Sequence, residues 1–403
     1  MVYEKGGLFT MSKDFIAERV KPLQASAIRE IFKMVGQSDI ISFAGGNPSS
    51  EIFPNETLAR LADEILEEHG TAALQYGVTE GYAPLRTFIS EEMKKEGIMK
   101  EGDGCLVTTG GQQVIDLCAK SLINEGDVVA VEAPSFIGGL NALRSYGGKL
   151  VGIEVLDDGL DIDALEELAK KEKIKLLYTI PTFQNPTGIT MSLEKRKKVL
   201  ALAEKYDFYI LEDNPYGKLR FQGEDIPTIK SMDKEGRVIY ASSYSKLISP
   251  GMRIGYGIMR NDIFDRMVVC KQVSDVHTPC LTQMMVYKFI TEYDFDAHIK
   301  KSIDMYREKC ALMIDCIDKY FPKNITHTTP EGGIFLWCKF DSDVDTKEIM
   351  KTCVEHKVVF VPGATAMVDI DKKCNMFRLN YSTPTLSQIE SGMKTMGDVL
   401  KSI

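Results

Sequence analysis

The sequence lacks several patterns that mark large classes of protein. None of its nine cysteines forms a C-x-x-C pair and their number is odd, so neither a zinc site nor a disulfide framework is indicated. No apolar run is long enough to span a membrane. The first fifteen residues also lack the apolar core of a secretory signal, and Met1 and Met11 are both candidate native starts. We therefore expect a cytoplasmic protein with reduced thiols, no metal site and no membrane contact.

An excess of positive charge is also missing. The chain has 49 lysines and arginines against 58 aspartates and glutamates, a formal net charge of −9 at pH 7. Broad electrostatic binding to nucleic acid favours a basic face, so we expect no nucleic-acid partner, although a local basic pocket remains compatible with this charge. The 403 residues can bury a large core and suggest two or three domains.

Two nucleotide-binding motifs are absent: the Walker sequence, and G-x-G-x-x-G after a strand. A helix over about 14–36 is expected, and from about residue 105 onward apolar strands alternate with helices. The expected strands lie at 105–109, 127–133, 149–155, 173–180, 208–213, 237–242 and 254–259. Continuous apolar strands between helices indicate an α/β fold with a mainly parallel sheet covered on both faces.

One lysine stands out in the turn between the last two of these strands. Ser243 to Arg253 reads SYSKLISPGMR and places Lys246 between two serines and a Pro-Gly turn. Such a lysine can be held at the mouth of a pocket, although this stretch alone fits a surface lysine equally well. Other polar residues collect beyond the carboxyl ends of the strands, where ligands bind in sheets of this kind. They are Asn185, Asp213, Tyr216, Ser243 and Ser245.

Residues at loops and helix starts add further candidates. Gly111 and Gln112 begin a helix, where free N–H groups and the helix dipole favour an anion. The dipole is worth only about 0.3–1 kcal/mol at an exposed site, so additional donors are needed. Gly46 lies in a Gly-Gly turn, Tyr76 lies on a glycine-containing loop, and Phe136 follows a strand. Each of these also fits a plain turn or a packing contact.

Pyridoxal phosphate is a cofactor that would use all of these groups. Its aldehyde needs a lysine amine for a Schiff base, which Lys246 offers. Its protonated ring nitrogen needs a carboxylate, and Asp213 stands at the end of a buried strand. Its 3′-oxygen needs neutral donors, which we assign to Asn185 and Tyr216. Its ring needs an aromatic face, which we assign to Phe136.

The phosphate of the same cofactor needs a helix N-terminus, hydroxyl groups and an arginine. The sequence offers all three kinds of group in the two stretches already described. We assign the phosphate to Gly111, Gln112, Ser243, Ser245 and Arg253. Each assignment is weak alone, but together they satisfy every polar group of one cofactor.

Ten short motifs then connect the whole chain to a known family. They are SFAGGNP (42–48), QYGVTEGYAPLR (75–86), TGGQQ (109–113), NPTG (185–188), DNPY (213–216), SYSK (243–246), GMRIGY (251–256), PEGGIFLW (330–337), FVPG (360–363) and FRLNYS (377–382). In these motifs and their order the sequence resembles the fold-type I, pyridoxal-phosphate-dependent aminotransferases of class I/II. It is most similar to the group that includes broad-range 2-aminoadipate and kynurenine aminotransferases.

The resemblance implies an architecture and a substrate clamp. A large domain (51–289) would hold a mainly parallel, seven-stranded type of sheet flanked by helices, and residues 1–50 and 290–403 would form a smaller α+β domain. The family's substrate arginine corresponds to Arg378, which would hold the α-carboxylate with help from Asn185 and the backbone at Gly46. The family forms homodimers, and Tyr76 would reach the phosphate in the neighbouring subunit.

The implied activity is transamination between an amino acid and a 2-oxo acid, with 2-oxoglutarate the expected acceptor. Lys246 would act as base and then acid, and Asp213 and Tyr216 complete the catalytic set. Two features depart from the family's commonest residues: Gly111 supplies only a backbone N–H, and Phe136 replaces the commoner Tyr or Trp. Residues 272–283 contain no arginine, which argues against aspartate as the donor.

Two other functions remain open from the sequence. The same cofactor supports β-elimination or decarboxylation, because the bond that breaks depends on how the substrate is held. The same fold also serves as an effector domain in transcription regulators that carry an added DNA-binding domain. The acidic chain, whose expected fold begins almost at its first residue, makes this non-enzymatic function the least favoured of the three.

Overall fold

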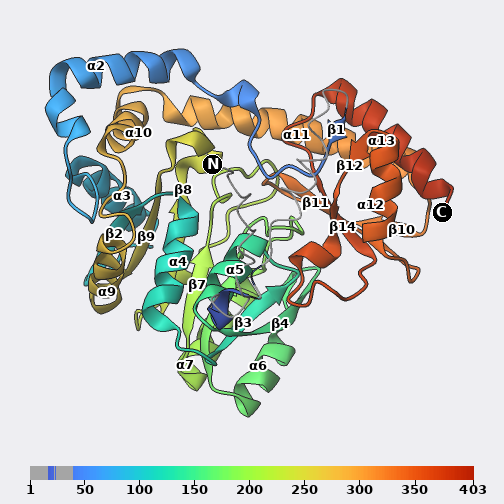
Figure 1. Ribbon diagram of the computed structural model, residues 1–403, viewed down its shortest axis with the longest axis horizontal. Coiled ribbons are helices and arrows are strands. Elements are labelled where there is room, and N and C mark those ends of the chain that lie inside the picture. Colours follow the sequence, from blue (N-terminus) through green and yellow to red (C-terminus); the bar gives the residue numbers. More distant parts are fainter. Residues whose placement is uncertain (1–16, 22, 24–39) are drawn as a thin grey trace, which may run out of the picture.

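The computed structural model describes residues 17–21, 23 and 40–403. Most of the helix expected over 14–36 lies outside these residues, and within them Glu18–Val20 forms a short 3-10 helix, η2. Figure 1 shows an α/β molecule with a large central sheet and a smaller sheet to its right. Within the described ranges, no helix combines the length and the apolar character needed to cross a bilayer.

The large sheet has eight strands in the order β2-β9-β8-β7-β6-β3-β4-β5. The neighbours from β8 to β4 run parallel, and β2, β9 and β5 add antiparallel pairs. The mainly parallel sheet expected from the sequence is confirmed, with the two-residue β5 as an addition. The strands are β2 (Asp103–Thr108), β3 (Val128–Ala133), β4 (Lys149–Leu156), β5 (Gly159–Leu160), β6 (Ile174–Thr179), β7 (Tyr209–Asp213), β8 (Val238–Ser243) and β9 (Gly255–Arg260).

Helices cover both faces of this sheet, which explains its apolar strands. In β3, Val129 and Val131 pack with α4, α5 and α9, whereas Val128 and Ala130 pack on the opposite side with α6, α7 and α8. Alternate side chains of a strand point to opposite faces, so both sets must be apolar. The helices are α4 (Gly111–Leu122), α5 (Ile137–Ser145), α6 (Ile162–Lys171), α7 (Leu193–Tyr206), α8 (Ile229–Met232) and α9 (Asn261–Gln272).

The smaller sheet is antiparallel, with the order β10-β11-β14-β13. A separate parallel pair, β1 with β12, lies beside it and carries the chain toward residues 43–46. The strands are β1 (Ile41–Ser42), β10 (Ile325–His327), β11 (Phe335–Phe340), β12 (Val358–Val359), β13 (Val361–Pro362) and β14 (Met376–Asn380), and the helices are α11 (Phe295–Tyr320), α12 (Thr346–Glu355) and α13 (Leu386–Lys401).

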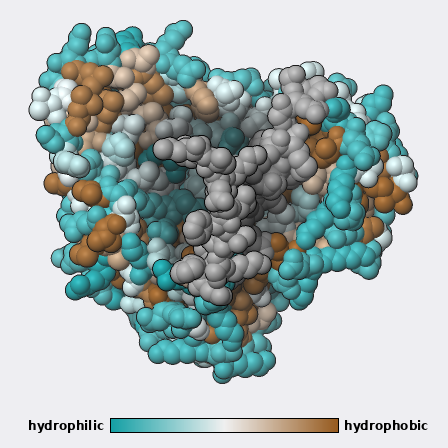
Figure 2. Space-filling model, in the orientation of Figure 1, coloured by the Kyte–Doolittle hydropathy of each residue, from teal (hydrophilic) through white to brown (hydrophobic). Residues whose placement is uncertain are grey.

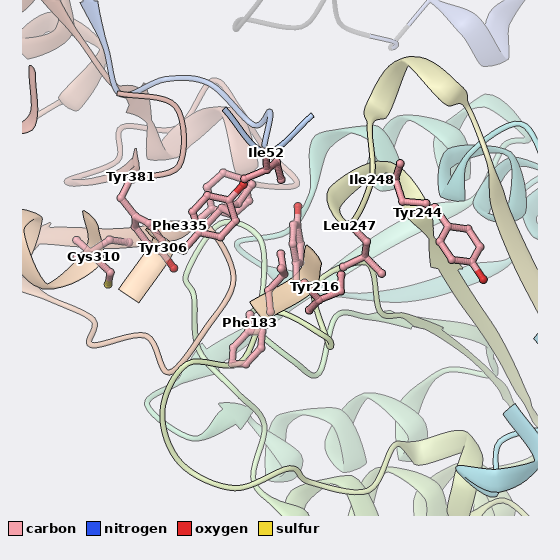
Figure 3. Close-up of a cluster of buried hydrophobic side chains, with 14 of the residues drawn as sticks. Ile52, Phe183, Tyr216, Tyr244, Leu247, Ile248, Tyr306, Cys310, Phe335 and Tyr381 are labelled. Carbon is pink, nitrogen blue, oxygen red and sulfur yellow. The ribbon is translucent and has the colours of Figure 1, made fainter. Parts of the chain in front are cut away.

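One large buried cluster joins the two sheets. It includes Phe183 and Tyr216 from loops of the large sheet and Phe335 and Tyr381 from the smaller one, which lie close together in Figure 3. The remaining helices are α2 (Asn55–Leu74), α3 (Ala83–Lys95), α10 (Cys280–Glu292), η3 (Ser50–Ile52), η4 (Tyr244–Lys246), η5 (Pro250–Met252) and η6 (Gly363–Ala366). The division at residues 51–289 stays a prediction, although each sheet lies within one of its two parts.

A buried arginine fixes the long loop between β6 and α7. Arg196 is fully buried in α7, and its guanidinium donates to the carbonyls of Pro181 and Met191 at 2.9 Å each. It also donates to Thr182 Oγ1 and to two carbonyls of the loop before α8. The N-P-T-G residues 185–188 lie inside this braced loop, so the arginine determines the backbone path around them.

We expect Arg196→Leu to lower the free energy of unfolding by at least about 3 kcal/mol, because several buried carbonyls lose their donor together. Urea unfolding followed by far-ultraviolet circular dichroism measures this loss. Lys198→Leu in the same helix is the control, since Lys198 only pairs with Glu194 on the exposed face. A variant at Arg196 that unfolds at the control's midpoint would contradict this role.

Candidate active site

Residues from four strands meet at one edge of the large sheet. Phe136 and Asn185 follow β3 and β6, Asp213 ends β7, and Ser243 ends β8. Strand β4 lies on one side of β3 and β6 on the other, so the topology reverses at this edge. Ligands bind at such reversals in open parallel sheets. Within residues 17–21, 23 and 40–403, no cluster of His, Cys, Asp or Glu could hold a metal ion.

Lys246 lies in η4, directly after β8. Its Nζ donates a hydrogen bond of 2.8 Å to the carbonyl oxygen of Gly46, two hundred residues earlier in the sequence. Burial, together with the positive charges of Arg378 and Arg253, lowers the pKa of Lys246 to about 8, and Asp213 acts in the opposite direction. The lysine therefore gives up its proton more readily than an ordinary lysine and can serve as a nucleophile or a base.

Asp213 lies on the α4 side of the sheet and has a partner that the sequence did not reveal. Tyr178 in β6 donates its hydroxyl hydrogen to Asp213 Oδ2 at 2.9 Å. Burial raises the pKa of Asp213 to about 7, while the bond from Tyr178 and the charge of Lys246 lower it. The sequence did contain a signal for this contact: Tyr178 places a hydroxyl group within the apolar run of β6, and a buried polar group needs a hydrogen-bond partner.

Arg378 is held from three sides and, among the described residues, keeps two N–H donors free, the one on Nε and one of the two on Nη1. Its Nη1 donates to Asn185 Oδ1 at 3.0 Å, and its Nη2 donates to the carbonyls of Ala44 and Gly45 at 2.8 and 3.1 Å. The guanidinium lies 4.2 Å from the ring centroid of Phe335. The Nε atom is buried without a hydrogen-bond partner, and burial lowers the pKa of Arg378 to about 10. An incoming anion would satisfy this unused donor.

Tyr216 stands between the lysine turn and the arginine. Figure 3 shows its ring between Phe335 and Leu247, and its ring centroid lies 5.8 Å from that of Phe335. Burial and the nearby Asp213 raise the pKa of the Tyr216 hydroxyl, whereas Arg378 and a hydrogen bond with Asn185 lower it. The hydroxyl therefore stays protonated at neutral pH and is available as a neutral hydrogen-bonding group.

The residues that we assign to the cofactor's phosphate lie together at the N-terminus of α4. A Cβ atom added to Gly111 would lie 3.6 Å from the Cβ of Ser243, so the helix start and the end of β8 are neighbours. Ser243 Oγ accepts from the backbone N–H of Ser245 at 3.0 Å and lies 2.8 Å from the Ser245 hydroxyl. Two hydroxyl groups therefore lie next to a free helix start.

Arg253 covers the same turn. Its Nη2 donates to the carbonyl of Thr109 at 3.0 Å and its Nη1 donates to that of Pro250 at 3.2 Å. Gly110 has a φ of +78°, and a Cβ atom there would lie 2.4 Å from Arg253 Nη2. Only glycine allows both this backbone angle and this close approach. The arginine and the helix start thus face one small region.

Gln112 and Phe136 meet over the start of α5. The side-chain amide of Gln112 donates to the carbonyl of Gly138 at 2.9 Å. A Cβ atom at Gly138 would lie 2.4 Å from the Phe136 ring and 2.5 Å from Gln112 Oε1. Tyr76 stands apart from the other candidates: its side chain is 81% exposed and packs edge to face against His277.

A buried ion pair supports the turn before α4. The side chain of Lys271 is fully buried and donates to Asp275 Oδ1 and to Gln113 Oε1, both at 2.8 Å. Gln113 Oε1 also accepts from the backbone N–H of Thr109 at 2.8 Å. The Thr109 hydroxyl donates to Asp275 Oδ2 at 2.9 Å. Sequence reasoning missed this support, whose signal was an i, i+4 Lys–Asp pair at the end of α9.

The lowered pKa of Lys246 predicts its reactivity in the cofactor-free chain. Its labelling by an amine-selective reagent should rise with pH through about 8, because the neutral amine is the reacting form. Peptide mass spectrometry across a pH series measures this midpoint. Lys95 is the control, since its hydrogen bond with Glu92 raises the pKa of that lysine.

Arg378→Leu should move the Lys246 midpoint upward, because it removes a positive charge that favours the neutral amine. A midpoint for Lys246 equal to that of Lys95 would contradict the electrostatic description.

Comparisons with known proteins agree with this geometry. A family model described as aminotransferase class I and II matches residues 38–395. The chain is 38% identical to aromatic-amino-acid aminotransferase 1 of Thermococcus litoralis, covering 96% of this chain and 94% of that protein. It is 37% identical to 2-aminoadipate transaminase of Thermus thermophilus, covering 94% and 95%. The solved kynurenine aminotransferase of Pyrococcus horikoshii has a TM-score of 0.94 at 34% identity, covering 98% and 99%. The chain belongs to the class I and II aminotransferase family.

Proposed function

We propose that this protein is a pyridoxal-phosphate-dependent aminotransferase that moves an amino group from an aromatic or aliphatic amino acid to 2-oxoglutarate. The observation that carries this proposal is Lys246, a lysine with a pKa of about 8 placed where the strands end. The charges of Arg378, Arg253 and Asp213 act on this lysine, so it is suited to react as an amine and not to form a surface ion pair. Family membership supports the reaction type and the cofactor.

The residues of the site fit the charges of that cofactor. Asp213, a buried carboxyl with a pKa of about 7, has no cation in direct contact among the described residues, and a protonated ring nitrogen would supply one. The α4 start with Ser243, Ser245 and Arg253 offers donors to a phosphate. The unused Nε of Arg378 suits a substrate carboxylate. Pyridoxal phosphate supplies an aldehyde for the amino group and a ring that withdraws electrons from the substrate α-carbon.

The protein's own side chains would then bind the substrate and move one proton. Arg378, with Asn185 and the backbone at Gly46, would orient the α-carboxylate. Lys246 would remove the proton at the α-carbon as a base and deliver it as an acid to the cofactor carbon that carried the aldehyde, which its lowered pKa favours. Tyr216 and Asn185 would donate to the cofactor's 3′-oxygen, Phe136 would lie against its ring, and Gly111 and Gln112 would contact its phosphate.

The donor class is inferred from relatives and from one absent residue. Relatives are named for aromatic amino acids, 2-aminoadipate and kynurenine, which have little in common beyond the α-amino acid group. Residues 272–283, which follow α9, contain no arginine that could hold a second carboxylate of aspartate. We therefore infer a broad donor range without a preference for aspartate.

A homodimer is the second part of the proposal. Six exposed apolar side chains occur in two segments that contact each other through Tyr76 and His277: Leu74, Tyr76, Val78, Val269, Val273 and Val276. Figure 2 shows hydrophobic surface on the left of the molecule, over the region of α10, α3 and β2. Exposed apolar patches of this kind mark protein interfaces. A second copy covering them would allow Tyr76 to reach the partner's phosphate.

Location in the cytoplasm is the third part. All nine cysteines lie in the described part of the chain as free thiols, seven of them buried. Thiols persist in this form in a reducing compartment.

The first test is the visible absorption spectrum of the protein with pyridoxal phosphate and a panel of amino acids. We expect the cofactor band to disappear with aromatic or aliphatic donors and to return with 2-oxoglutarate. Lys246→Ala should abolish turnover while the fold is retained, because Lys246 is the group proposed to move the α-proton. Lys218→Ala, a surface lysine paired with Glu96, is the control. Ammonia or carbon dioxide release without amino transfer would instead identify a lyase or a decarboxylase.

The second test asks whether two subunits share each site. Tyr76→Ala and Lys246→Ala are each expected to lose activity, the first through weaker cofactor binding. Mixed and reassociated, the two variants should regain about a quarter of native activity, because half of the dimers are hybrids with one complete site. No recovery in mixtures shown by mass spectrometry to contain hybrids would place Tyr76 in its own subunit's site or outside it.

A further inference from the structure

A second buried carboxylate lies next to the site but on the other face of the sheet. Glu132 in β3 is 2% exposed and points to the side covered by α6, α7 and α8. One of its oxygens accepts from Thr179 Oγ1, and both accept from the backbone N–H of Ile180 at 3.2 Å. Its other oxygen accepts from Gln184 Nε2 at 2.9 Å. None of the proposed chemistry uses this group.

Gln184 passes this interaction on to the N-P-T-G turn. Its Nε2 donates to Glu132 and to the carbonyl of Pro134, and its Oε1 accepts from the Thr187 backbone N–H at 2.9 Å and hydroxyl at 2.8 Å. All the hydrogen-bonding positions of the amide are therefore used. Its backbone closes the same loop, with bonds to Gly188 and Ile189.

The turn that Gln184 holds also carries the partner of the substrate arginine. Asn185 lies between Gln184 and Thr187 and accepts from Arg378 Nη1 at 3.0 Å. That bond and those to the carbonyls of Ala44 and Gly45 leave Nε as the one guanidinium nitrogen without a partner among the described residues. Asn185 is the only side chain that accepts a hydrogen bond from Arg378 among the described residues. A shift of Asn185 would therefore change the direction in which the unpartnered Nε of Arg378 points.

We propose that Glu132 is a positioning residue for substrate binding, acting through Gln184 and Asn185 on the orientation of Arg378. The inference rests on the proposed function for what Arg378 binds, but the hydrogen-bonded chain itself is independent of it. Glu132 touches neither cofactor nor substrate in this scheme. Its effect should therefore appear in substrate affinity more than in the chemical step.

The direction of each hydrogen bond makes the proposal testable. Burial raises the pKa of Glu132 to about 7, and above that pH the carboxylate only accepts, so it forces the Gln184 amide to point its NH₂ toward position 132 and its oxygen toward Thr187. In Glu132→Gln, two NH₂ groups would face each other if the new oxygen stays with Thr179 and Ile180. Turning the Gln184 amide over would place its NH₂ against the Thr187 N–H instead. Turning the new amide at 132 over would keep the bond from Gln184, but its NH₂ would then face the Ile180 N–H and the Thr179 hydroxyl would lose its acceptor. Every arrangement therefore leaves a buried donor unpaired.

Exchanging the two side chains restores the polarity. In Glu132→Gln combined with Gln184→Glu, the amide at 132 donates to the carboxylate at 184, which still accepts from the N–H and hydroxyl of Thr187. The bond to the Pro134 carbonyl is lost, and a carboxylate oxygen then faces that carbonyl oxygen, so the recovery is not complete. The double variant should therefore recover most of what the single variant loses.

Steady-state kinetics of the holoenzyme with one donor and 2-oxoglutarate give the main readout. We expect Glu132→Gln to raise KM for both substrates about tenfold, the value of one hydrogen bond to a charged group, with kcat lowered less than about threefold. The cofactor absorption band should be unchanged. The double variant should return KM to within about threefold of the native value.

A second readout does not depend on activity. In the cofactor-free chain, hydrogen exchange at the backbone amides of Thr187, Gly188 and Ile189 should be about tenfold faster in Glu132→Gln and native-like in the double variant. If the native enzyme fails to transfer amino groups, the proposed function is wrong, and exchange alone then decides this inference.

Glu212→Gln is the matched control. Glu212 is equally buried, lies in the same cross-strand row one strand beyond Thr179, and accepts from the backbone N–H groups of Ile229 and Lys230. It should lose stability without a change in KM or in exchange at 187–189. An equal rise of KM in this control would overturn the proposal, as would a folded Glu132→Gln with native KM. If Glu132→Gln does not fold, the double variant decides, and its failure to fold or to recover KM also overturns it.

Discussion

The electrostatic constraint on which this structure depends is the burial of two cations, Lys246 and Arg378, at one edge of a parallel sheet. Arg378 and the exposed Arg253 both lower the pKa of Lys246, and Asp213 is the carboxylate that offsets them. Such a group of cations is unfavourable without counter-charges, because burial penalises each charged form. The lowered pKa values of Lys246 and Arg378, about 8 and about 10, are the direct result.

The smaller sheet holds one of these buried cations, Arg378, in place. Arg378 lies in β14, where it pairs with Trp337 of β11, and its guanidinium reaches the carbonyls of Ala44 and Gly45. Those carbonyls follow β1, which is aligned by its pairing with β12. Neutral carbonyl oxygens hold the arginine in place without neutralising it. The protein therefore orients the cation and leaves its charge for a bound anion.

Side chains of a strand alternate between the two faces of the large sheet, so residues of the proposed active site lie on one face and residues that support it lie on the other. Tyr178 and Asp213 point to the α4 side of the sheet, where the residues assigned to the cofactor lie. Glu132, Thr179 and Glu212 form a row on the opposite side. The two buried carboxylates in that row, Glu132 and Glu212, have different tasks. Glu212 anchors the start of α8, and Glu132 braces the loop that holds Asn185.

Much of this arrangement can be predicted from the sequence, and the contacts that cannot be predicted share one physical reason. Strand ends, helix starts and tight turns are local, so residues such as Gly111, Asp213 and Lys246 could be placed by pattern and by family resemblance. The bonds from Tyr178 to Asp213 and from Lys271 to Gln113 could not, because they depend on strand register and on helix docking between distant segments. The side chain of Gln112 likewise turns toward Gly138, which no local signal indicates.

The charges of the site also constrain what can occupy it. A ligand with two anionic ends and one cationic centre would oppose the shifts of Arg378 and Asp213: an anion near Arg378 would stabilise its guanidinium group, and a cation beside Asp213 would return that carboxyl toward its ordinary pKa. Cofactor phosphate, substrate carboxylate and protonated ring nitrogen have this pattern. A simple anion would satisfy the arginines but leave Asp213 buried without a cation. Charge balance at Asp213 therefore distinguishes the cofactor with its substrate from an anion alone.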